Sequence, residues 1–571
     1  MLLNHHFLRL FIFLLLGITA CKPNGTPKAL INPQKQAFGD SVMVVSAHPL
    51  ATQAGLDVLQ EGGNAIDAMV TVHLALAVAY PRAGNIGGGG FLVYRTAKGE
   101  VHTLDFREQA PQQAERDMYL DEQGNVVDSL SLIGHLASGV PGSVAGLYEA
   151  HRKFGQLPWE KLVQPAIELA QQGLLLTKRE AKTLNKFRPL FEQANANSNA
   201  FLSKKKWKAG DNLQQSDLAA TLRRIAGQGR AGFYQGETAD LIVEDMKNHG
   251  GIITHDDLKN YQAVWRTPIK IPYKEYTIWS MAPPSSGGIC LAELLNMVEP
   301  YPLSTWGYGD PKSIHVITEA ARRAYADRAE HLGDTDFHPV PIASLTSQEY
   351  ANGRMQNFND TLATPSDSIS HGTPYPKESD QTTHYCIVDV EGNVVSVTTT
   401  INSNFGSKVV IDKAGFFMNN EMDDFSAKPG VPNQFGLLGN AANAIAPNKR
   451  MLSSMTPSIV EKDGRFLLAV GSPGGSKIIT TVFQVITNVI EFGLPLEQAV
   501  QNPRFHFQWY PDTLYYEQDA FSKTQLQALE GLGHHPKKRE DIGQVEAVLQ
   551  LPDGRLEGVA DRRGDDHAGG W

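Results

Sequence analysis

The bond between Gln381 and Thr382 marks an abrupt change in the character of this chain. Residues 360–381 contain few apolar side chains and are dominated by Pro, Ser, Thr and Asp, which is typical of a loop or linker. Residues 382–389 and 394–401 follow as two β-branched runs, and the Glu-Gly-Asn between them indicates a hairpin turn. The chain is therefore expected to enter a β-hairpin directly from a long polar segment.

Thr382 allows two interpretations. A threonine at the start of a strand usually reflects β propensity alone. If the bond before it were cut, however, the same residue would carry a hydroxyl and a free α-amine. Such an amine titrates at about pH 8 in model peptides and can act as the general base for the hydroxyl. The pattern by itself leaves both interpretations open.

Helical and strand-like segments alternate over the rest of the chain. Asn64 is predicted to cap the helix that follows it. The predicted helices are concentrated in the earlier part of the chain and the hairpins in the later part. This order indicates helices packed on an antiparallel sheet, which is an α+β fold. The predicted strands are 42–47, 91–94, 458–461, 466–470 and 545–549, and the predicted helices are 51–60, 65–80, 144–153, 159–172, 218–227, 238–248, 289–297, 313–331 and 478–492.

The N-terminus has the pattern of a targeting segment. Residues 1–20 predict a signal peptide, whose apolar run is far shorter than the roughly 20 residues that span a membrane. The Ile-Thr-Ala-Cys ending resembles a bacterial lipobox, which implies that Cys21 becomes a lipidated N-terminus. A simple cleaved signal with an incidental Cys21 is the alternative. Residues 21–36 are expected to form a tether.

Composition excludes several classes of protein. With 42% hydrophobic and 20% charged residues, the 571-residue chain is neither disordered nor collagen-like. A net charge of −10 argues against nucleic acid as a partner. The three cysteines are too few for a structural zinc site. Cys290 and Cys386 are expected to be small buried hydrophobic residues, and the sequence does not decide whether they pair.

Motifs of several common active sites are missing from the sequence. It contains no Gly-x-Ser-x-Gly, His-Glu-x-x-His, phosphate loop or Cys-x-x-Cys. The glycines at 87–90 lack the spacing of a dinucleotide loop and are expected to form a tight turn with close backbone packing. Neither a metal nor a cofactor is expected.

Several long motifs, spread from about residue 40 to the end, carry a resemblance to a known family. The chain resembles the γ-glutamyltranspeptidases. The matching segments are Gly62-Gly63-Asn64-Ala65-Ile66-Asp67-Ala68, Gly87-Gly88-Gly89-Gly90-Phe91, Asp105-Phe106-Arg107-Glu108, Met281-Ala282-Pro283-Pro284-Ser285-Ser286-Gly287-Gly288, Thr382-Thr383-His384-Tyr385, the run 398–406, the run 419–426, Ser453-Ser454-Met455-Thr456-Pro457 and Gly471-Ser472-Pro473-Gly474-Gly475.

The resemblance implies an N-terminal-nucleophile hydrolase, an αββα sandwich of two antiparallel sheets between helical layers. It also implies a precursor that cuts itself between Gln381 and Thr382. The products are a large subunit, 37–381 after the tether, and a small subunit, 382–571, which together form one globular unit. The polar linker fits this cleavage, because a segment that repositions afterwards should not be tied into a core.

The resemblance also implies a functional role for each residue of this sequence that matches a site residue of the family. Thr382 is the implied nucleophile, and Thr400 is the threonine whose hydroxyl contacts it. The substrate's α-carboxylate requires a bidentate cation, which Arg107 matches, with Ser453 and Ser454 as hydroxyl donors. The α-ammonium requires acceptors, which are Asn402, Glu421 and Asp424. Gly474 and Gly475 match the oxyanion hole, because glycine amides can approach an oxyanion closely in front of a helix.

Residues 428–439 resemble the lid loop of many bacterial members. Phe435 stands where those lids usually carry tyrosine, so a more loosely closing aromatic gate is expected. The lid and the set around Arg107 favour small γ-glutamyl substrates.

The implied function is γ-glutamyl transfer and glutathione hydrolysis. Partners are glutathione and other γ-glutamyl donors, and amino acid or dipeptide acceptors. The expected location is the periplasmic cell envelope, with a lipid anchor as the one membrane contact; Lys22 in place of aspartate favours the outer membrane. The alternatives are an acylase or poly-γ-glutamate enzyme on the same scaffold, and a non-catalytic envelope lipoprotein.

Overall fold

Two large antiparallel sheets form the centre of the structure. The computed structural model describes residues 27–28, 31–370, 382–428, 430–434, 436–439 and 441–571. Within them, one sheet has the spatial order β1 (Gln36–Gly39), β18 (Leu556–Ala560), β17 (Glu546–Gln550), β13 (Arg465–Gly471), β12 (Ser458–Lys462), β9 (Tyr276–Ser280) and β8 (Ile269–Tyr273). The other has β19 (His567–Gly570), β2 (Met43–Ser46), β10 (Thr383–Val388), β11 (Val394–Thr400), β3 (Gly89–Arg95), β4 (Val101–Asp105) and β7 (Val264–Arg266).

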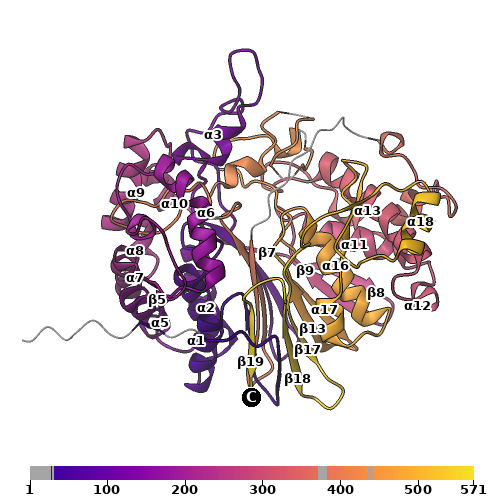
Figure 1. Ribbon diagram of the computed structural model, residues 1–571, viewed down its shortest axis with the longest axis horizontal. Helices are drawn as coiled ribbons and strands as arrows, with labels where there is room; N and C mark the ends of the chain where they lie inside the picture. The colour runs from indigo at the N-terminus through magenta and orange to yellow at the C-terminus, as the bar shows by residue number, and fades with distance from the viewer. Residues whose placement is uncertain (1–26, 29–30, 371–381, 429, 435, 440) are drawn as a thin grey trace, which may run out of the picture.

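Helices cover both outer faces of the paired sheets (Figure 1). The β2–β10–β11–β3 sheet packs under α1 (Pro49–Gln60), α2 (Ala65–Ala79), α4 (Ser143–Phe154), α5 (Trp159–Gln172), α6 (Lys178–Ala194), α7 (Ser216–Gln228) and α9 (Gly236–Asn248). The second sheet packs under α11 (Gly287–Val298), α13 (Pro311–His331), α16 (Lys477–Ile490) and α17 (Leu496–Gln501). The remaining α-helices of the described residues are α3 (Asp128–Leu132), α8 (Ala231–Tyr234), α10 (His255–Asn260), α12 (Leu303–Trp306), α14 (Ile342–Leu345), α15 (Gln348–Arg354) and α18 (Lys523–Gly531).

A third apolar cluster fills the space between the sheets. Val45, Val93 and Cys386 from one sheet pack with Ile459 and Val548 from the other. Alternating strand residues therefore bury both faces of each sheet, which is the condition for a four-layer sandwich. The αββα expectation is confirmed.

The helix and strand predictions agree with the structure in most places. Asn64 caps α2 through bonds from the amides of Ile66 and Asp67, and the Asp67 side chain completes the capping box. The hairpin is β10 and β11, with Thr383 opposite Thr399. Short elements such as β7, β8 and β9 were not predicted, because three to five residues give too little periodicity.

The polar linker is anchored more firmly than its composition indicates. Within its described part, Ser366 is buried, accepts a bond from Arg322 and donates one to the Trp509 carbonyl. Ile369 is buried in the apolar cluster that also contains residues of α11 and α16. The expectation that the whole linker stays outside the core is therefore wrong for 363–369. Gln381 and residues 371–380 lie outside the described residues.

The end of the predicted tether also contacts the globular unit. The Lys35 ammonium donates to the carbonyl of Asp566, and Gln36 opens β1. Cys21 and the predicted signal peptide lie outside the described residues. Cys290 and Cys386 are buried free thiols, as expected. No helix in the described part of the chain is long and apolar enough to cross a bilayer.

Candidate active site

A cavity of about 290 Å³ lies where β11 ends and α16 begins. Its walls come from segments that are hundreds of residues apart in the sequence. The lining residues are Arg107, Arg328, Thr382, Thr400, Asn402, Glu421, Asp424, Leu437, Ser453, Ser454, Met455, Gly475 and Ile478. The structure therefore brings nine of the predicted site residues to one cavity.

Thr382 and Thr400 face each other across the central hairpin. Thr382 precedes the first residue of β10 and is only 4% exposed, and Thr400 is the last residue of β11. The two Oγ1 atoms are 3.5 Å apart. Thr400 Oγ1 also accepts a hydrogen bond from the Asn402 amide at 2.7 Å. The hairpin register thus places a second hydroxyl beside that of Thr382.

The glycines at and just before the start of β3 allow this segment to pack closely against the hairpin. A Cβ at Gly88 would lie 2.1 Å from the Thr400 carbonyl oxygen, and one at Gly90 would lie 2.5 Å from that of Thr398. Asn85 adds bonds to Thr399 Oγ1 and to the Thr400 carbonyl, both at 3.1 Å. The close packing expected for 87–90 is confirmed, and it holds Thr400 in place. The expected tight turn is wrong for Gly89 and Gly90, which begin β3.

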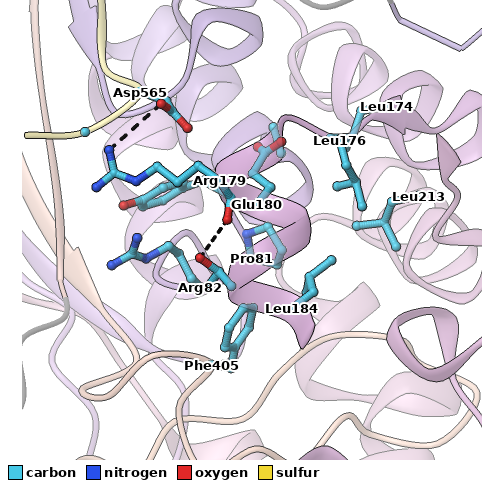
Figure 2. A pocket seen from close by; sticks show the side chains of 14 residues that line it. Pro81, Arg82, Leu174, Leu176, Arg179, Glu180, Leu184, Leu213, Phe405 and Asp565 are labelled. Carbon is cyan, nitrogen blue, oxygen red and sulfur yellow. Dashed lines mark hydrogen bonds and ion pairs between the residues drawn. The ribbon is translucent and has the colours of Figure 1, made fainter. Parts of the chain in front are cut away.

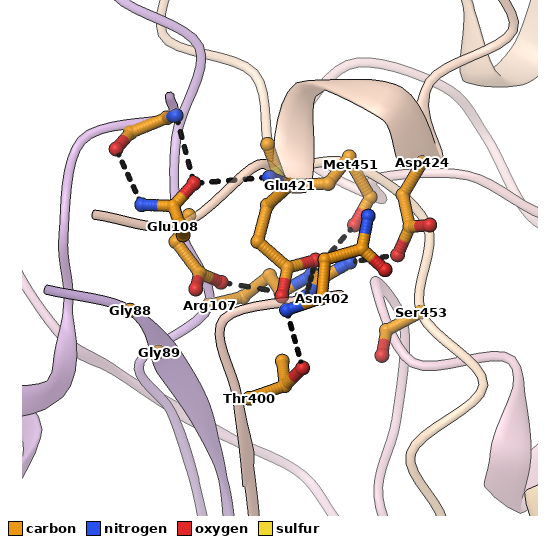
Figure 3. Close-up of polar contacts among 12 residues, drawn as sticks. Gly88, Gly89, Arg107, Glu108, Thr400, Asn402, Glu421, Asp424, Met451 and Ser453 are labelled. Carbon is orange, nitrogen blue, oxygen red and sulfur yellow. Dashed lines mark hydrogen bonds and ion pairs between the residues drawn. The ribbon is translucent and has the colours of Figure 1, made fainter. Parts of the chain in front are cut away.

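Arg107 forms the charged centre of the cavity (Figure 3). Its guanidinium is fully buried and donates to Glu421 Oε2 and Asp424 Oδ2, each at 2.5 Å. Glu108 Oε2 lies 3.4 Å from the same group. One cation is therefore surrounded by three buried or partly buried carboxylates. Oε1 of Glu421 is buried and accepts no hydrogen bond from the described residues.

The protonation of these acids differs from that of surface acids. Burial raises the pKa of Glu108 to about 7, against the opposing effect of Arg107. Burial likewise raises the pKa values of Glu421 and Asp424 above their usual range. The negative charge around Arg107 therefore decreases as the pH falls through these raised pKa values.

Asn402, Ser453 and Ser454 complete the polar wall. Asn402 has a φ of 70° and donates from Nδ2 to the Asn420 carbonyl at 3.0 Å. Ser453 Oγ accepts a bond from the Met455 amide, and Ser454 Oγ accepts one from Arg328 Nη2 at 3.2 Å. Each hydroxyl keeps its own O–H available as a donor toward a ligand.

Gly474 and Gly475 form the turn into α16. Their φ values are 137° and 56°, a backbone region that favours glycine. Gly475 lines the cavity, whereas Gly474 adjoins it. Within the described part of the chain, neither amide donates a hydrogen bond. Two free N–H groups at a helix N-terminus are suited to an oxyanion.

Sequence reasoning missed Arg328 in this cavity. This residue of α13 is buried and donates to Ser286 Oγ at 2.9 Å and to Ser454 Oγ. Burial lowers the pKa of its guanidinium. A helix-interior arginine gives no sign of its role in the sequence, and only its proximity to Ser454 reveals it.

The described part of the predicted lid contacts the site. Leu437 lines the cavity, and Asn433 Nδ2 lies 3.3 Å from Asp424 Oδ1. The Gln434 amide donates to Asp423. Phe435 lies outside the described residues.

A larger cavity of about 500 Å³ has different walls (Figure 2). Leu174, Leu184 and Phe405 form its apolar side, and Arg179 pairs with Asp565 at its rim. It shares no lining residue with the Thr382 cavity. Its walls contain no nucleophile paired with a second hydroxyl, so the smaller cavity is the candidate active site.

Comparisons with known proteins agree with this location. Residues 51–571 match the family described as Gamma-glutamyltranspeptidase. The chain is 47% identical over 550 residues to the glutathione hydrolase proenzyme of Escherichia coli (strain K12), covering 96% of this chain and 94% of that one.

Among solved structures, it is similar to a cephalosporin acylase from Bacillus halodurans, with a TM-score of 0.83 and 28% identity, covering 96% of this chain and 99% of that one. It is also similar to the Helicobacter pylori gamma-glutamyltranspeptidase, with a TM-score of 0.56 and 46% identity, covering 60% and 97%.

An αββα sandwich with a buried threonine at the start of its central hairpin has the architecture of an N-terminal-nucleophile hydrolase. Within that class, the chain belongs to the γ-glutamyltranspeptidase family.

Proposed function

We propose that this protein is a self-cleaving γ-glutamyltransferase and glutathione hydrolase whose nucleophile is Thr382. The observation that carries the proposal is the pairing of the Thr382 and Thr400 hydroxyls in the same cavity as the buried Arg107 cluster. Membership of the family and the proenzyme relative support it. Incubation with glutathione tests it. Without a dipeptide the expected products are glutamate and cysteinylglycine, and with a dipeptide a γ-glutamyl tripeptide should form as well.

The reaction begins with cleavage before Thr382, which frees its α-amine. That amine takes the proton from Oγ1, and the oxygen attacks the γ-carbonyl carbon of the donor. The amides of Gly474 and Gly475 stabilise the negative charge on the carbonyl oxygen. The C–N bond breaks, the leaving amine takes the proton, and a γ-glutamyl ester remains on Thr382. Water or an acceptor amine then attacks that ester by the same route in reverse.

Donor recognition uses the charges around Arg107. The α-carboxylate of the donor is held by Arg107 with Ser453 and Ser454, and its α-ammonium by Asn402, Glu421 and Asp424. The free Oε1 of Glu421 supports this division, because a buried carboxylate oxygen without a donor is costly until a cation reaches it. Arg328 keeps Ser454 in place and adds positive charge on the carboxylate side.

The two predicted subunits are interleaved in this fold. β10 and β11 belong to the small subunit and lie between β2 and β3 of the large one. Strands of both predicted subunits also make up the other large sheet, so cleavage at Gln381–Thr382 would leave a heterodimer that shares both sheets. The Helicobacter pylori chain supports this division, because it matches 60% of the present chain across nearly its full length. We further propose export to the periplasmic envelope and lipidation at Cys21.

An acylase is the second candidate, because a cephalosporin acylase is a structural neighbour at TM-score 0.83. A γ-glutamyltransferase should require the α-ammonium group of its donor, whereas an acylase should not. The carboxylates around Arg107 favour a zwitterionic donor. A γ-glutamyl amide should therefore be hydrolysed much faster than the same amide without its α-amino group, and equal rates would favour the acylase.

Thr400→Val is expected to lower kcat by about 10²-fold or more, because it removes the hydroxyl that contacts the nucleophile. Thr400→Ser keeps that hydroxyl and should retain most of the activity. Steady-state kinetics on purified, processed protein measures both. Full activity in Thr400→Val would make Thr400 an ordinary strand residue.

Glu421→Gln is expected to remove most of the pH dependence of donor binding. An acid with a raised pKa is ionised above that pKa and neutral below it, so the ammonium site is present at high pH and lost as the pH falls. The wild-type KM should rise as the pH falls through the raised pKa of Glu421, whereas the KM of the variant should start about tenfold higher and change much less with pH. Parallel KM profiles would contradict this role for Glu421.

Phe435→Tyr is expected to tighten the lid, because the added hydroxyl supplies a hydrogen bond that phenylalanine lacks. The KM for the donor should fall, and the ratio of transfer to hydrolysis should change. Product analysis at a fixed acceptor concentration measures both. If neither quantity changes, residue 435 is not the gate.

A further inference from the structure

We propose that His135, Asp245 and His249 form a binding site for one divalent transition-metal ion of the Zn²⁺ class, separate from the catalytic cavity. His135 begins the short helix η1 (His135–Ala137), Asp245 lies in the last turns of α9, and His249 follows its end. Asp245 and His249 are four residues apart and so lie on one side of the helix. None of the three lines the Thr382 cavity.

The spacing of the three side chains fits one ion. His135 Nε2 lies 3.3 Å from Asp245 Oδ2, and His249 Nδ1 lies 3.0 Å from Asp245 Oδ1. One ligand atom from each residue can be chosen so that all three lie within 4.8 Å of one another. Tetrahedral zinc with bonds of about 2.0–2.1 Å separates its ligand atoms by roughly 3.3–3.4 Å. Small side-chain shifts therefore complete the arrangement.

His135 supplies an independent indication of a ligand. The residue is 6% exposed, and its Nε2 makes no hydrogen bond to the described residues apart from its ion-pair contact with Asp245 Oδ2 at 3.3 Å. A buried ring nitrogen with only this contact is incompletely satisfied, and a bound cation would offset that cost. The His135 and His249 rings stack with centroids 4.8 Å apart, so both present an edge to the Asp245 carboxylate.

The surroundings of the Asp245 carboxylate favour its ionised form, which is the form that binds a cation. Burial alone would raise the pKa of Asp245, but its contacts with His135 lower that pKa below the usual value. The Asp412 amide also donates to Asp245 Oδ2 at 3.4 Å, which orients the carboxylate from outside. Asp412 belongs to the predicted small subunit, so the site joins both predicted subunits.

Solvent reaches the site through a cavity of about 380 Å³. His249 lies on its open side with 35% of its side chain exposed, and Asp217 and Asp412 are among the walls. The opening leaves room for water as the fourth ligand. In the structure, His249 Nδ1 donates to the Asp245 carbonyl oxygen at 3.0 Å. Binding a metal through Nδ1 requires the other tautomer of the neutral ring, with its proton on Nε2.

The donor set favours certain metals. Two imidazoles and one carboxylate suit Zn²⁺, Co²⁺, Ni²⁺ and Cu²⁺, whereas Mg²⁺ and Ca²⁺ require oxygen ligands. We propose Zn²⁺ as the bound ion. Co²⁺ serves as the spectroscopic probe, because it takes the same geometry and absorbs visible light.

The experiment titrates Co²⁺ into tag-free, processed protein after chelator treatment and dialysis. The wild type should develop the absorption bands of tetrahedral Co²⁺ at one equivalent, and Zn²⁺ should abolish them. His249→Ala and Asp245→Asn should each weaken binding at least about 100-fold. The matched control is His255→Ala, which removes another histidine–aspartate pair that is exposed and outside the site; it should bind like the wild type.

Thermal unfolding gives a second readout that does not depend on activity. Zn²⁺ should raise the Tm of the wild type and of His255→Ala, and should leave that of His249→Ala unchanged. If the wild type binds no more Co²⁺ than His249→Ala, the cluster is a histidine–aspartate ion-pair network and the proposal is wrong. The same holds if His255→Ala loses binding as well.

Discussion

Thr382→Ala is expected to remain a single uncut chain and to lose γ-glutamyl transfer by about 10⁴-fold or more. The hydroxyl is the attacking group both in self-cleavage and in catalysis, and the α-amine that serves as its base exists only after cleavage. A denaturing gel of the purified protein and an assay with a chromogenic γ-glutamyl anilide measure the two effects.

Two variants separate this role from general damage to the hairpin. Thr382→Ser keeps a hydroxyl and should still be cut, although more slowly. Thr383→Val changes the next residue, whose buried Oγ1 has no hydrogen-bond partner among the described residues. It should be cut and remain active. A wild-type protein that stays uncut, or a Thr382→Ala protein that is cut, would contradict the mechanism.

Arg107→Lys is expected to lower kcat/KM for γ-glutamyl donors by roughly 10²–10³-fold. Lysine keeps the charge but loses the planar pair of N–H donors, whose charge-assisted bonds contribute about 1.5–3 kcal/mol each. It also leaves Glu421 and Asp424 without the partners that Arg107 provides at 2.5 Å.

The control for this variant is Arg152→Lys, at an exposed arginine paired with Glu149, which should behave like the wild type. A second comparison uses donors that lack the α-carboxylate. The kcat/KM of the wild type for these donors should be as low as that of Arg107→Lys for the complete donor. A variant that still discriminates between the two donors would show that Arg107 does not hold the carboxylate.

The sequence predicted the main elements because their periodicity is long. Trp159–Gln172 was predicted with the bounds that α5 has, and β10 and β11 differ from their predictions by one or two residues. The strands β7 to β9 give almost no pattern, since a three- to five-residue strand looks like any short apolar run. The expectation that the linker near Ser366 lies outside the core was wrong. A polar segment can be anchored by hydrogen bonds to buried partners such as Arg322 and Trp509.

The candidate site was predicted mainly through its motifs. Thr382, Thr400 and Arg107 stand in runs that resemble the family, and the structure places them around one cavity. Arg328 and Asn85 could not be predicted, because their importance depends on what they touch. Arg328 supports Ser454 from α13, and Asn85 supports Thr400 from the loop before β3. The sequence does not contain these distances.

Mass spectrometry of the acyl-enzyme tests the central claim most directly. The protein is mixed with a γ-glutamyl donor, quenched in acid within the first turnover, and digested. The account predicts a small chain that begins at Thr382 and carries one γ-glutamyl group on its N-terminal peptide. A small chain that begins elsewhere, or an acyl group on any other residue, would contradict it.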